Sequence, residues 1–261
     1  MSDWLGLAGR RAAVSGGGSG IGQGCALALS RAGVAVTALD RDEQALAATV
    51  ALAGAEGLTI RTSACDVTDP SSVQRAAEEC GNVDILVNAA GIGRPGTLLD
   101  MDPADWQLLL DINLTGYLAT TRAFAPGMVE RGRGSLVHIA SISSRHPQPG
   151  SGAYSASKAG VTLMSQQLAY ELGPSGVRSN TVSPGLVRTP MTEAYYQAPG
   201  VAERRDAAVP LRRVARPEDI ADVVVFLASD RARYVTGADI AVDGGFATTL
   251  MGTVPRPGFD R

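Results

Sequence analysis

The sequence predicts a doubly wound α/β domain, with a seven-stranded, mostly parallel sheet and helices on both of its faces. Two observations predict this fold class. Short aliphatic runs alternate with longer segments of helical period along the chain, and a glycine-rich turn directly follows the first run. Neither an internal repeat nor a linker-like change in composition interrupts the alternation. We therefore interpret residues 1–261 as a single domain.

Seven apolar runs of strand length define the predicted sheet, at residues 12–15, 34–40, 60–64, 85–88, 135–140, 177–183 and 240–242. Six segments of helical period lie between them, at residues 20–32, 43–53, 70–80, 103–131, 153–172 and 217–227. Each segment begins near a capping residue or a proline. Because these helices connect parallel strands, they must cover both faces of the sheet.

Two segments lie outside this alternation. Residues 189–210, the least regular stretch, follow the sixth strand, and we expect them to form a substrate-binding lid above the carboxyl ends of the strands. Residues 253–261 carry prolines and a glycine, and we interpret them as a flexible terminus, with a subunit contact as the alternative.

Composition excludes several classes of function. The formal net charge is −3 at pH 7 with both signs interspersed, so no basic stripe is available for nucleic acid. Three separated cysteines and two histidines predict reduced structural thiols and no metal site. The N-terminus lacks the apolar core of a signal peptide, and no apolar run approaches the length that spans a bilayer. We expect a cytoplasmic protein without a membrane partner.

The glycine-rich segment SGGGSGIG, residues 15–22, connects the first strand to the first helix. Glycines permit positive φ and a close approach of backbone to pyrophosphate, and a helix N-terminus offers free N–H groups. The glycines that matter are Gly16, Gly20 and Gly22, whose spacing differs from the strict G-x-G-x-x-G pattern. Taken alone, this motif also fits a flexible turn.

Asp40 strengthens the dinucleotide interpretation because it ends the second strand, where an acid binds the adenosine ribose hydroxyls. A carboxylate at this position predicts NAD and disfavours NADP, since it would repel the additional phosphate. Ser19, the residue before Gly20, offers no cation to compensate for that phosphate. Arg41 is the contrary feature, although beside Asp40 we expect it to point to solvent.

A tyrosine and a lysine open the fifth long helix as Tyr154-Ser-Ala-Ser-Lys158. A four-residue step places both side chains on one helix face. A free tyrosine has a pKa of about 10, so a nearby cation is needed before its phenolate can act as a base at neutral pH. Lys158 supplies that cation, although a pair with this spacing is common in ordinary helices.

Further motifs in chain order make the sequence similar to the classical short-chain dehydrogenase/reductases, a family with a Rossmann-like doubly wound fold. These motifs are the glycine-rich loop, NAAG at 88–91, Asn113, Ser141, the Tyr154–Lys158 pair and SPGLVRT at 183–189. Ser141 precedes Tyr154 by thirteen positions, the usual family interval, which distinguishes it from Ser143 and Ser144. Ser15 and Ala89 are the two mild departures from the family pattern.

The resemblance implies a catalytic tetrad. Tyr154 would exchange a proton with the substrate hydroxyl, while Lys158 would lower the pKa of Tyr154 and hold the nicotinamide ribose. Ser141 would orient the substrate oxygen. Asn113 would kink its helix and hold a water that links Lys158 to solvent. Hydroxyl donors already placed at the reacting oxygen would lower the barrier electrostatically.

The resemblance also implies the contacts with the cofactor. Asp66 and Val67 would contact the adenine, and Asn88 would lie beside the adenosine ribose. The Val187 backbone would hold the carboxamide, and the Thr189 hydroxyl would reach toward the carboxamide or the pyrophosphate. The implied cofactor-binding residues are Gly16, Ser19, Gly20, Ile21, Gly22, Asp40, Asp66, Val67, Asn88, Gly91, Tyr154, Lys158, Val187 and Thr189.

The implied activity is hydride transfer between NAD(H) and the secondary alcohol/ketone pair of a small-molecule substrate, by a homotetrameric enzyme. One alternative is an NADPH-dependent 3-oxoacyl thioester reductase acting on acyl-carrier-protein substrates, which Asp40 disfavours. Another is a non-catalytic dinucleotide-binding protein, which the complete tetrad disfavours. The sequence does not predict the substrate, the stereochemistry or the direction of the reaction.

Several other residues have two interpretations each. His146 is either a substrate contact or an exposed loop residue, whereas we expect His138 to be a satisfied core histidine. Tyr195 and Tyr196 either line an apolar pocket in the lid or serve packing. Four arginines either bind an anionic substrate group or are solvated: Arg204, Arg205, Arg212 and Arg213.

Overall fold

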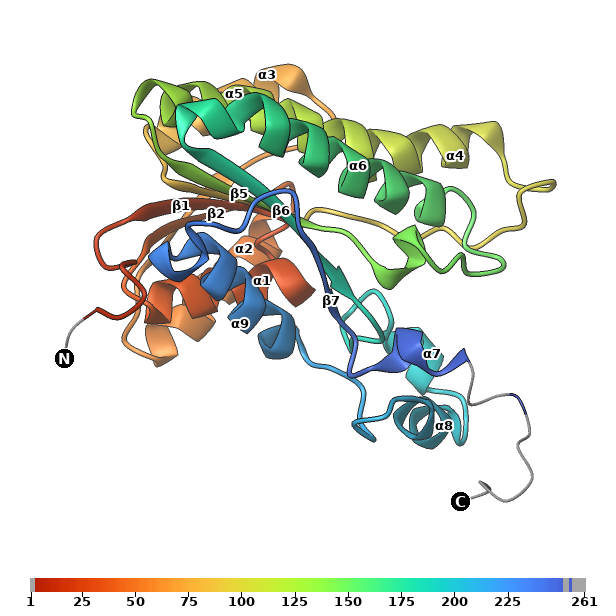
Figure 1. The fold of residues 1–261 in the computed structure, drawn as a ribbon. Coiled ribbons are helices and arrows are strands. Elements are labelled where there is room, and N and C mark those ends of the chain that lie inside the picture. The colour runs from red at the N-terminus through yellow and green to blue at the C-terminus, as the bar shows by residue number, and fades with distance from the viewer. Residues whose placement is uncertain (1–2, 251–253, 255–261) are drawn as a thin grey trace.

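The computed structural model describes residues 3–250 and 254, so the predicted tail, apart from Val254, lies outside the described residues (Figure 1). Its strands are β1 (Arg11–Ser15), β2 (Ala35–Asp40), β3 (Ile60–Ala64), β4 (Ile85–Asn88), β5 (Gly134–Ile139), β6 (Val177–Pro184) and β7 (Asp239–Val242). Its α-helices are α1 (Gly20–Arg31), α2 (Glu43–Ala55), α3 (Pro70–Cys80), α4 (Pro103–Leu110), α5 (Gly116–Glu130), α6 (Tyr154–Leu172), α7 (Glu193–Tyr196), α8 (Val201–Ala208) and α9 (Pro217–Ala228).

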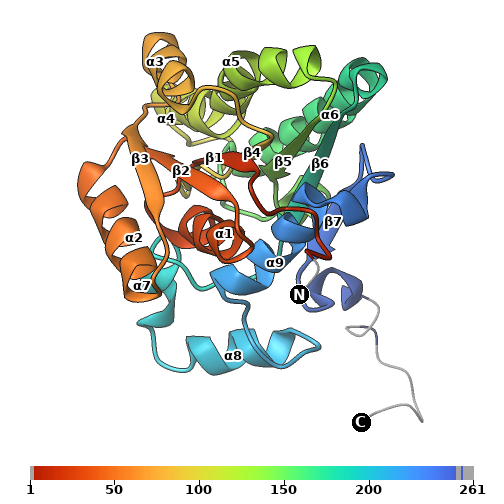
Figure 2. The ribbon, with the colours of Figure 1, turned by 90° about the vertical axis from the view of Figure 1, so that its left-hand side faces the viewer.

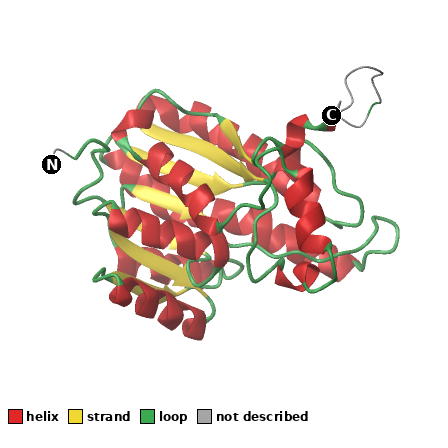
Figure 3. Cartoon of the chain, turned by 90° about the horizontal axis from the view of Figure 1, so that it is seen from below, coloured by secondary structure: helices red, strands yellow, loops and turns green. Residues whose placement is uncertain are grey.

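The seven strands form one parallel sheet in the order β3-β2-β1-β4-β5-β6-β7. Helices α1, α2 and α9 cover one face, and α3, α4, α5 and α6 cover the other (Figure 2). Figure 3, seen from below, shows helices covering the strands. The predicted doubly wound fold is therefore confirmed, and the strand order reverses between β1 and β4, where such folds bind their ligands.

The central strands are buried on both faces, which explains why they appear in the sequence as continuous apolar runs. Val14 of β1 packs into the core that includes Leu29 of α1 and Val224 of α9. Its neighbour Ala13 faces the opposite core, which includes Met128 of α5. Successive residues of a strand point to opposite faces, so one short strand contributes to both layers.

The predicted helix 103–131 is not continuous, but its interruption lies at Asn113, where the family resemblance implied a kink. A π-helical segment, Asp111–Thr115, separates α4 from α5. Asn113 is the middle residue of this segment, and its side chain bonds the Ile92 backbone twice, accepting from its N–H at 2.9 Å and donating to its C=O at 3.0 Å. Such π-bulges mark functional positions more often than ordinary helical turns do.

The predicted lid also differs from expectation, because residues 189–210 contain α7 and α8 and are not an irregular stretch. Arg205 of α8 lies 5.0 Å from the ring centroid of Tyr195 and 4.8 Å from that of Tyr196. These cation–π contacts join the two short helices. Within the described part of the chain, no helix is long and apolar enough to cross a membrane.

Candidate active site

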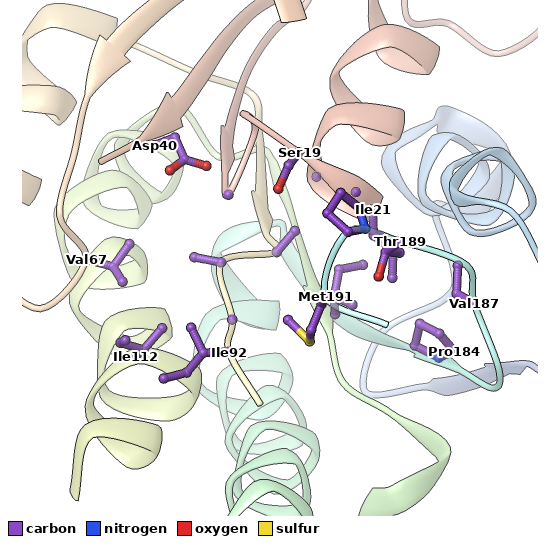
Figure 4. Close-up of a pocket in the computed structure, with 18 of the residues that line it drawn as sticks. Ser19, Ile21, Asp40, Val67, Ile92, Ile112, Pro184, Val187, Thr189 and Met191 are labelled. Atoms are coloured by element: carbon purple, nitrogen blue, oxygen red, sulfur yellow. The ribbon is translucent and has the colours of Figure 1, made fainter. Parts of the chain in front are cut away.

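A cavity of about 560 Å³ lies at the carboxyl ends of the strands, where β1 and β4 meet. This volume is within the range of about 300–1,000 Å³ typical of small-molecule sites. The view of Figure 4 places Asp40 at one side of the cavity and Val187 at the other. Its lining brings together most of the predicted site residues: Gly16, Ser19, Gly20, Ile21, Gly22, Asp40, Asp66, Val67, Gly91, Ser141, Tyr154, Lys158, Val187 and Thr189.

The glycine-rich loop has the close packing that a pyrophosphate cradle requires. Gly16 has a φ of +69°, and a Cβ there would lie 2.7 Å from the Ala90 backbone nitrogen. A Cβ on Gly22 would lie 2.1 Å from the Gly16 carbonyl oxygen. Ser19, the N-cap of α1, makes no side-chain cap hydrogen bond, so its hydroxyl does not occupy the amides of the first turn. These residues fit a dinucleotide phosphate at the N-terminus of α1.

Asp40 is fixed at the end of β2 by backbone amides. One carboxylate oxygen accepts from the Gly18 N–H at 3.1 Å, and the other accepts from the Asp42 N–H at 3.1 Å. The carboxylate thus lies against the glycine-rich loop, on the wall of the cavity. Arg41 is exposed but also contributes to the lining, so both charges are present where a ribose would lie.

Tyr154 and Lys158 lie one turn apart at the start of α6, and the Lys158 Nζ is 5.8 Å from the Tyr154 ring centroid. Lys158 is buried and donates to the Ile139 carbonyl at 2.8 Å. Burial lowers the pKa of Lys158 to about 7. Burial also raises the pKa of Tyr154, and a hydrogen bond with Ser141 acts in the opposite direction.

Ser141 is positioned by a short 3-10 turn, Ile142–Ser144, which it caps at the end of β5. Its Oγ accepts from the Ser143 N–H at 3.1 Å, which leaves the hydroxyl proton available for another acceptor. Farther along the same loop, Arg145 forms an ion pair of 3.0 Å with the buried Asp239 of β7. The loop that carries Ser141 is therefore tied to the far edge of the sheet.

Asn113 and Asn88 are the two predicted site residues outside the cavity lining. Asn113 holds the Ile92 backbone and donates to the Ser157 Oγ at 3.4 Å, so it connects the segment after β4 with α6. The Asn88 side chain is buried, where its Oδ1 accepts from Thr120 Oγ1 at 2.7 Å. A ribose contact at position 88 would therefore have to come from the backbone.

The two histidines lie in different surroundings. His138 is a satisfied core histidine, as predicted, since its two ring nitrogens lie 3.1 Å from Asn88 Nδ2 and 3.3 Å from Ser179 Oγ. Burial, aided by the charge of Lys158, lowers the pKa of His138 to about 3. His146 is exposed.

The remaining candidates lie away from the cavity wall. Tyr195 and Tyr196 pack on Arg205 and do not contribute to the cavity lining. Arg213 pairs with Asp219 at 2.6 Å. All three cysteines are buried free thiols, and in the described residues no cluster of ligand side chains could hold a metal ion.

Sequence reasoning missed the apolar part of the cavity wall. Met191 points into the cavity beside Thr189 (Figure 4). Ile92, in the loop after β4, and Ile112, in the π-helical segment, also line the cavity. The sequence alone does not show which hydrophobic residues of a loop or a helix line a cavity. The one clue was that Met191 follows Thr189, a predicted site residue, by two positions.

Comparisons with known proteins agree with this geometry. Residues 16–247 match the family model described as enoyl-(acyl carrier protein) reductase. The chain is 36% identical to a 3-oxoacyl-[acyl-carrier-protein] reductase of Thermotoga maritima, over 92% of this chain and 98% of that protein. It is 39% identical to a D-threitol dehydrogenase of Mycolicibacterium smegmatis, over 92% of this chain and 94% of that protein.

A solved structure described as a gluconate 5-dehydrogenase from Burkholderia cenocepacia, in complex with NADP and tartrate, has the same fold. It superimposes with a TM-score of 0.89 at 30% identity, covering 95% of this chain and 99% of that one. Family motifs, sheet order and near-complete coverage of several relatives lead to one conclusion. The chain belongs to the classical short-chain dehydrogenase/reductase family and is an oxidoreductase that uses a nicotinamide dinucleotide.

Proposed function

We propose that the chain is an NAD-dependent dehydrogenase or reductase of a secondary alcohol/ketone pair, in which Tyr154 is the general acid/base. The observation that carries this proposal is the convergence of Ser141, Tyr154 and Lys158 on the cavity whose opposite end is formed by the glycine-rich loop and Asp40. A site that only bound a dinucleotide would need the second group of residues but not the first.

The chemistry divides between the nicotinamide and the side chains. The bound nicotinamide would supply the hydride acceptor in oxidation and the hydride donor in reduction. During oxidation, Tyr154 as phenolate accepts the proton of the substrate hydroxyl, and during reduction the phenol returns it to the developing alkoxide. Ser141 donates a hydrogen bond to the substrate oxygen, where negative charge develops. Lys158 stabilises the phenolate, which burial disfavours.

Asp40 supports NAD as the cofactor. Its carboxylate, fixed by the Gly18 and Asp42 amides, would accept hydrogen bonds from the adenosine ribose hydroxyls and repel a phosphate at the same position. A related fold accommodates NADP, as the complex from Burkholderia cenocepacia illustrates, so the preference must be set by individual side chains. Arg41 is the side chain here that would favour NADP.

The second candidate function is NADPH-dependent reduction of a 3-oxoacyl thioester. It is favoured by the similarity to the Thermotoga maritima reductase and by the description of the matching family model. Similarity to a D-threitol dehydrogenase supports small polyol substrates to the same degree. Turnover of a panel containing both substrate classes, with each cofactor, would separate the two candidates.

Replacement of Tyr154 by phenylalanine tests the acid/base role. We expect turnover to fall by about 10²–10⁴-fold, the range for loss of a general acid/base, while NADH still binds with similar affinity. Tyr234→Phe makes the same chemical change at a fully exposed position outside the cavity lining and is the control. Full activity of the Tyr154→Phe enzyme would overturn the mechanism, and a wild type without turnover would favour a non-catalytic dinucleotide-binding protein.

We also propose a homotetramer in which α5 and α6 pair between subunits. Exposed apolar side chains on these helices support this: Leu118, Leu163 and Tyr170 are 41%, 68% and 87% exposed. Patches of this kind on a soluble protein commonly mark interfaces. Size-exclusion chromatography with light scattering should give a mass four times that of the chain, and a monomer would contradict the proposal.

A further inference from the structure

Lys158 lies against a second tyrosine, Tyr117 of α5, which belongs to none of the motifs described above. The Lys158 Nζ lies 3.3 Å from the Tyr117 hydroxyl and 4.9 Å from the centroid of its ring. The Tyr117 hydroxyl donates its only proton to the Ile139 carbonyl at 3.2 Å. Its lone pairs are therefore free to accept from the ammonium, which donates to the same carbonyl at 2.8 Å.

Tyr117 has no room to move away from this position. Its side chain is 0% exposed, and its ring stacks on His138 with centroids 6.1 Å apart and planes inclined by 24°. His138 is held in turn by Asn88, whose Nδ2 donates to Nδ1 at 3.1 Å, so that Nε2 carries the proton of the neutral ring. Thr121 anchors the Tyr117 backbone by donating to its carbonyl at 2.7 Å.

The ammonium depends on neutral acceptors because no opposite charge faces it. Tyr154 approaches from the same helix, Tyr117 from α5, and His138 from β5, where it is neutral. None of the ion pairs found in the described residues includes Lys158. The Ile139 carbonyl and the Tyr117 hydroxyl and ring face are thus the groups that compensate for its burial.

We propose that Tyr117 is a positioning residue for Lys158, which holds the buried ammonium in its charged form and directs it toward Tyr154. Tyr117 does not contribute to the cavity lining, so it acts through Lys158 without touching substrate or cofactor. The role in turnover rests on the proposed acid/base function of Tyr154. The effect on the Lys158 ammonium does not depend on that function, because it involves only side chains and backbone groups of the protein.

The composition of the chain makes this effect directly measurable, since Lys158 is its only lysine. Protein labelled with [¹³Cε]lysine gives one side-chain NMR signal, whose chemical shift follows the protonation of Lys158 without any assignment step. Titration of the wild type should give a pKa near 7. Tyr117→Phe keeps the ring and removes the acceptor, and we expect it to lower that pKa by about 0.5–1 pH unit.

Ser135→Ala is the matched control. It removes a buried hydroxyl from β5, the strand that carries Ile139, and that hydroxyl donates to the Leu227 carbonyl of α9 at 3.1 Å. We expect this variant to lose stability and to keep the wild-type lysine titration. Equal titrations in wild type and Tyr117→Phe would overturn the proposal and leave Tyr117 a packing residue. If Tyr117→Phe does not fold, 3-fluorotyrosine at position 117 weakens the acceptor with little change in volume and should shift the titration in the same direction.

The pH profile of alcohol oxidation extends the test to catalysis. A less stable ammonium stabilises the Tyr154 phenolate less, so the acidic limb of kcat/KM should move upward by about 0.5–1 pH unit in Tyr117→Phe. A lysine titration that shifts without movement of this limb would refute the link to turnover. Activity that survives in Tyr154→Phe would instead refute the proposed function, and the lysine titration would still decide the role of Tyr117.

Discussion

Replacing Asp40 by asparagine should reduce the preference for NADH over NADPH by about two orders of magnitude. The substitution keeps the shape of the side chain and removes its charge. A ribose phosphate carries a charge of about −1.5 to −2. We take a separation of about 5 Å between this phosphate and the Asp40 carboxylate, and an effective dielectric between those of water and a protein surface. Their repulsion is then about 2 kcal/mol, or roughly 30-fold in the affinity for NADPH. Weaker hydrogen bonds to the ribose hydroxyls would cost NADH about 1 kcal/mol.

Fluorescence titration of both reduced cofactors measures this preference, and Asp42→Asn provides the control. Asp42 also contributes to the cavity lining, but its carboxylate caps α2, where Oδ1 accepts from the Gln44 N–H at 2.9 Å. Asparagine is an equally good N-cap, so the control should fold. We expect less than about a threefold change in its preference, because this exposed carboxylate is held by the first amides of α2 and its charge is screened by solvent.

Two results would refute this reasoning. An unchanged preference in Asp40→Asn would mean that the carboxylate does not face the ribose. An equal shift in Asp42→Asn would mean that general negative charge, and not the position of Asp40, sets the preference. NADPH preferred by the wild type would show that Arg41 dominates and would promote the thioester reductase candidate.

Two further predictions concern stability. Gly22→Ala should destabilise the fold by about 1–3 kcal/mol and weaken NADH binding, since its Cβ would lie 2.1 Å from the Gly16 carbonyl oxygen. Gly54→Ala, whose Cβ would meet nothing within 4 Å, should instead stabilise α2 by up to about 1 kcal/mol, and denaturant unfolding of both variants checks the contrast. The pKa of His138 is about 3 in the folded state and 6.5 in the unfolded state. Between these two pH values the unfolded state binds more protons, so the free energy of unfolding decreases as the pH falls from 6.5 toward 3. At pH 5 the loss attributable to this group is about 2 kcal/mol, and urea unfolding of His138→Asn should show a correspondingly smaller decrease between pH 7.5 and pH 5. An identical pH dependence in wild type and variant would contradict the assignment of His138 as a buried neutral group.

The sheet was predictable because its strands obey a simple local rule. Strands buried on both faces require runs of apolar residues, and capping residues or prolines announce the helices that connect them. The interruption at Asp111–Thr115 was not predictable in this way, since a π-helical turn has no composition of its own. Only the family resemblance implied a kink at Asn113, whose side chain here bonds the Ile92 backbone, 21 positions away.

Site residues could be predicted where the chemistry requires a particular type of side chain. They could not be predicted where it requires only a cavity wall of suitable shape. Tyr154 and Lys158 were found because a tyrosine base needs a nearby cation, which a four-residue step on a helix provides, and Ser141 was found through the family resemblance. Met191 was missed because many apolar side chains can form the same wall. The substrate remained unpredicted for the same reason.

Tyr117 was missed for a different reason: its role depends on a contact between α5 and α6 that no local pattern encodes. The composition nevertheless bears on it. Of the 23 lysine and arginine residues, all but one are arginine, and lysine occurs only at position 158. A guanidinium has five donors and stays charged, so in this buried site it would leave donors unsatisfied beside one carbonyl and one hydroxyl. A compact ammonium with few partners meets the geometry of the Ile139 carbonyl and the Tyr117 hydroxyl.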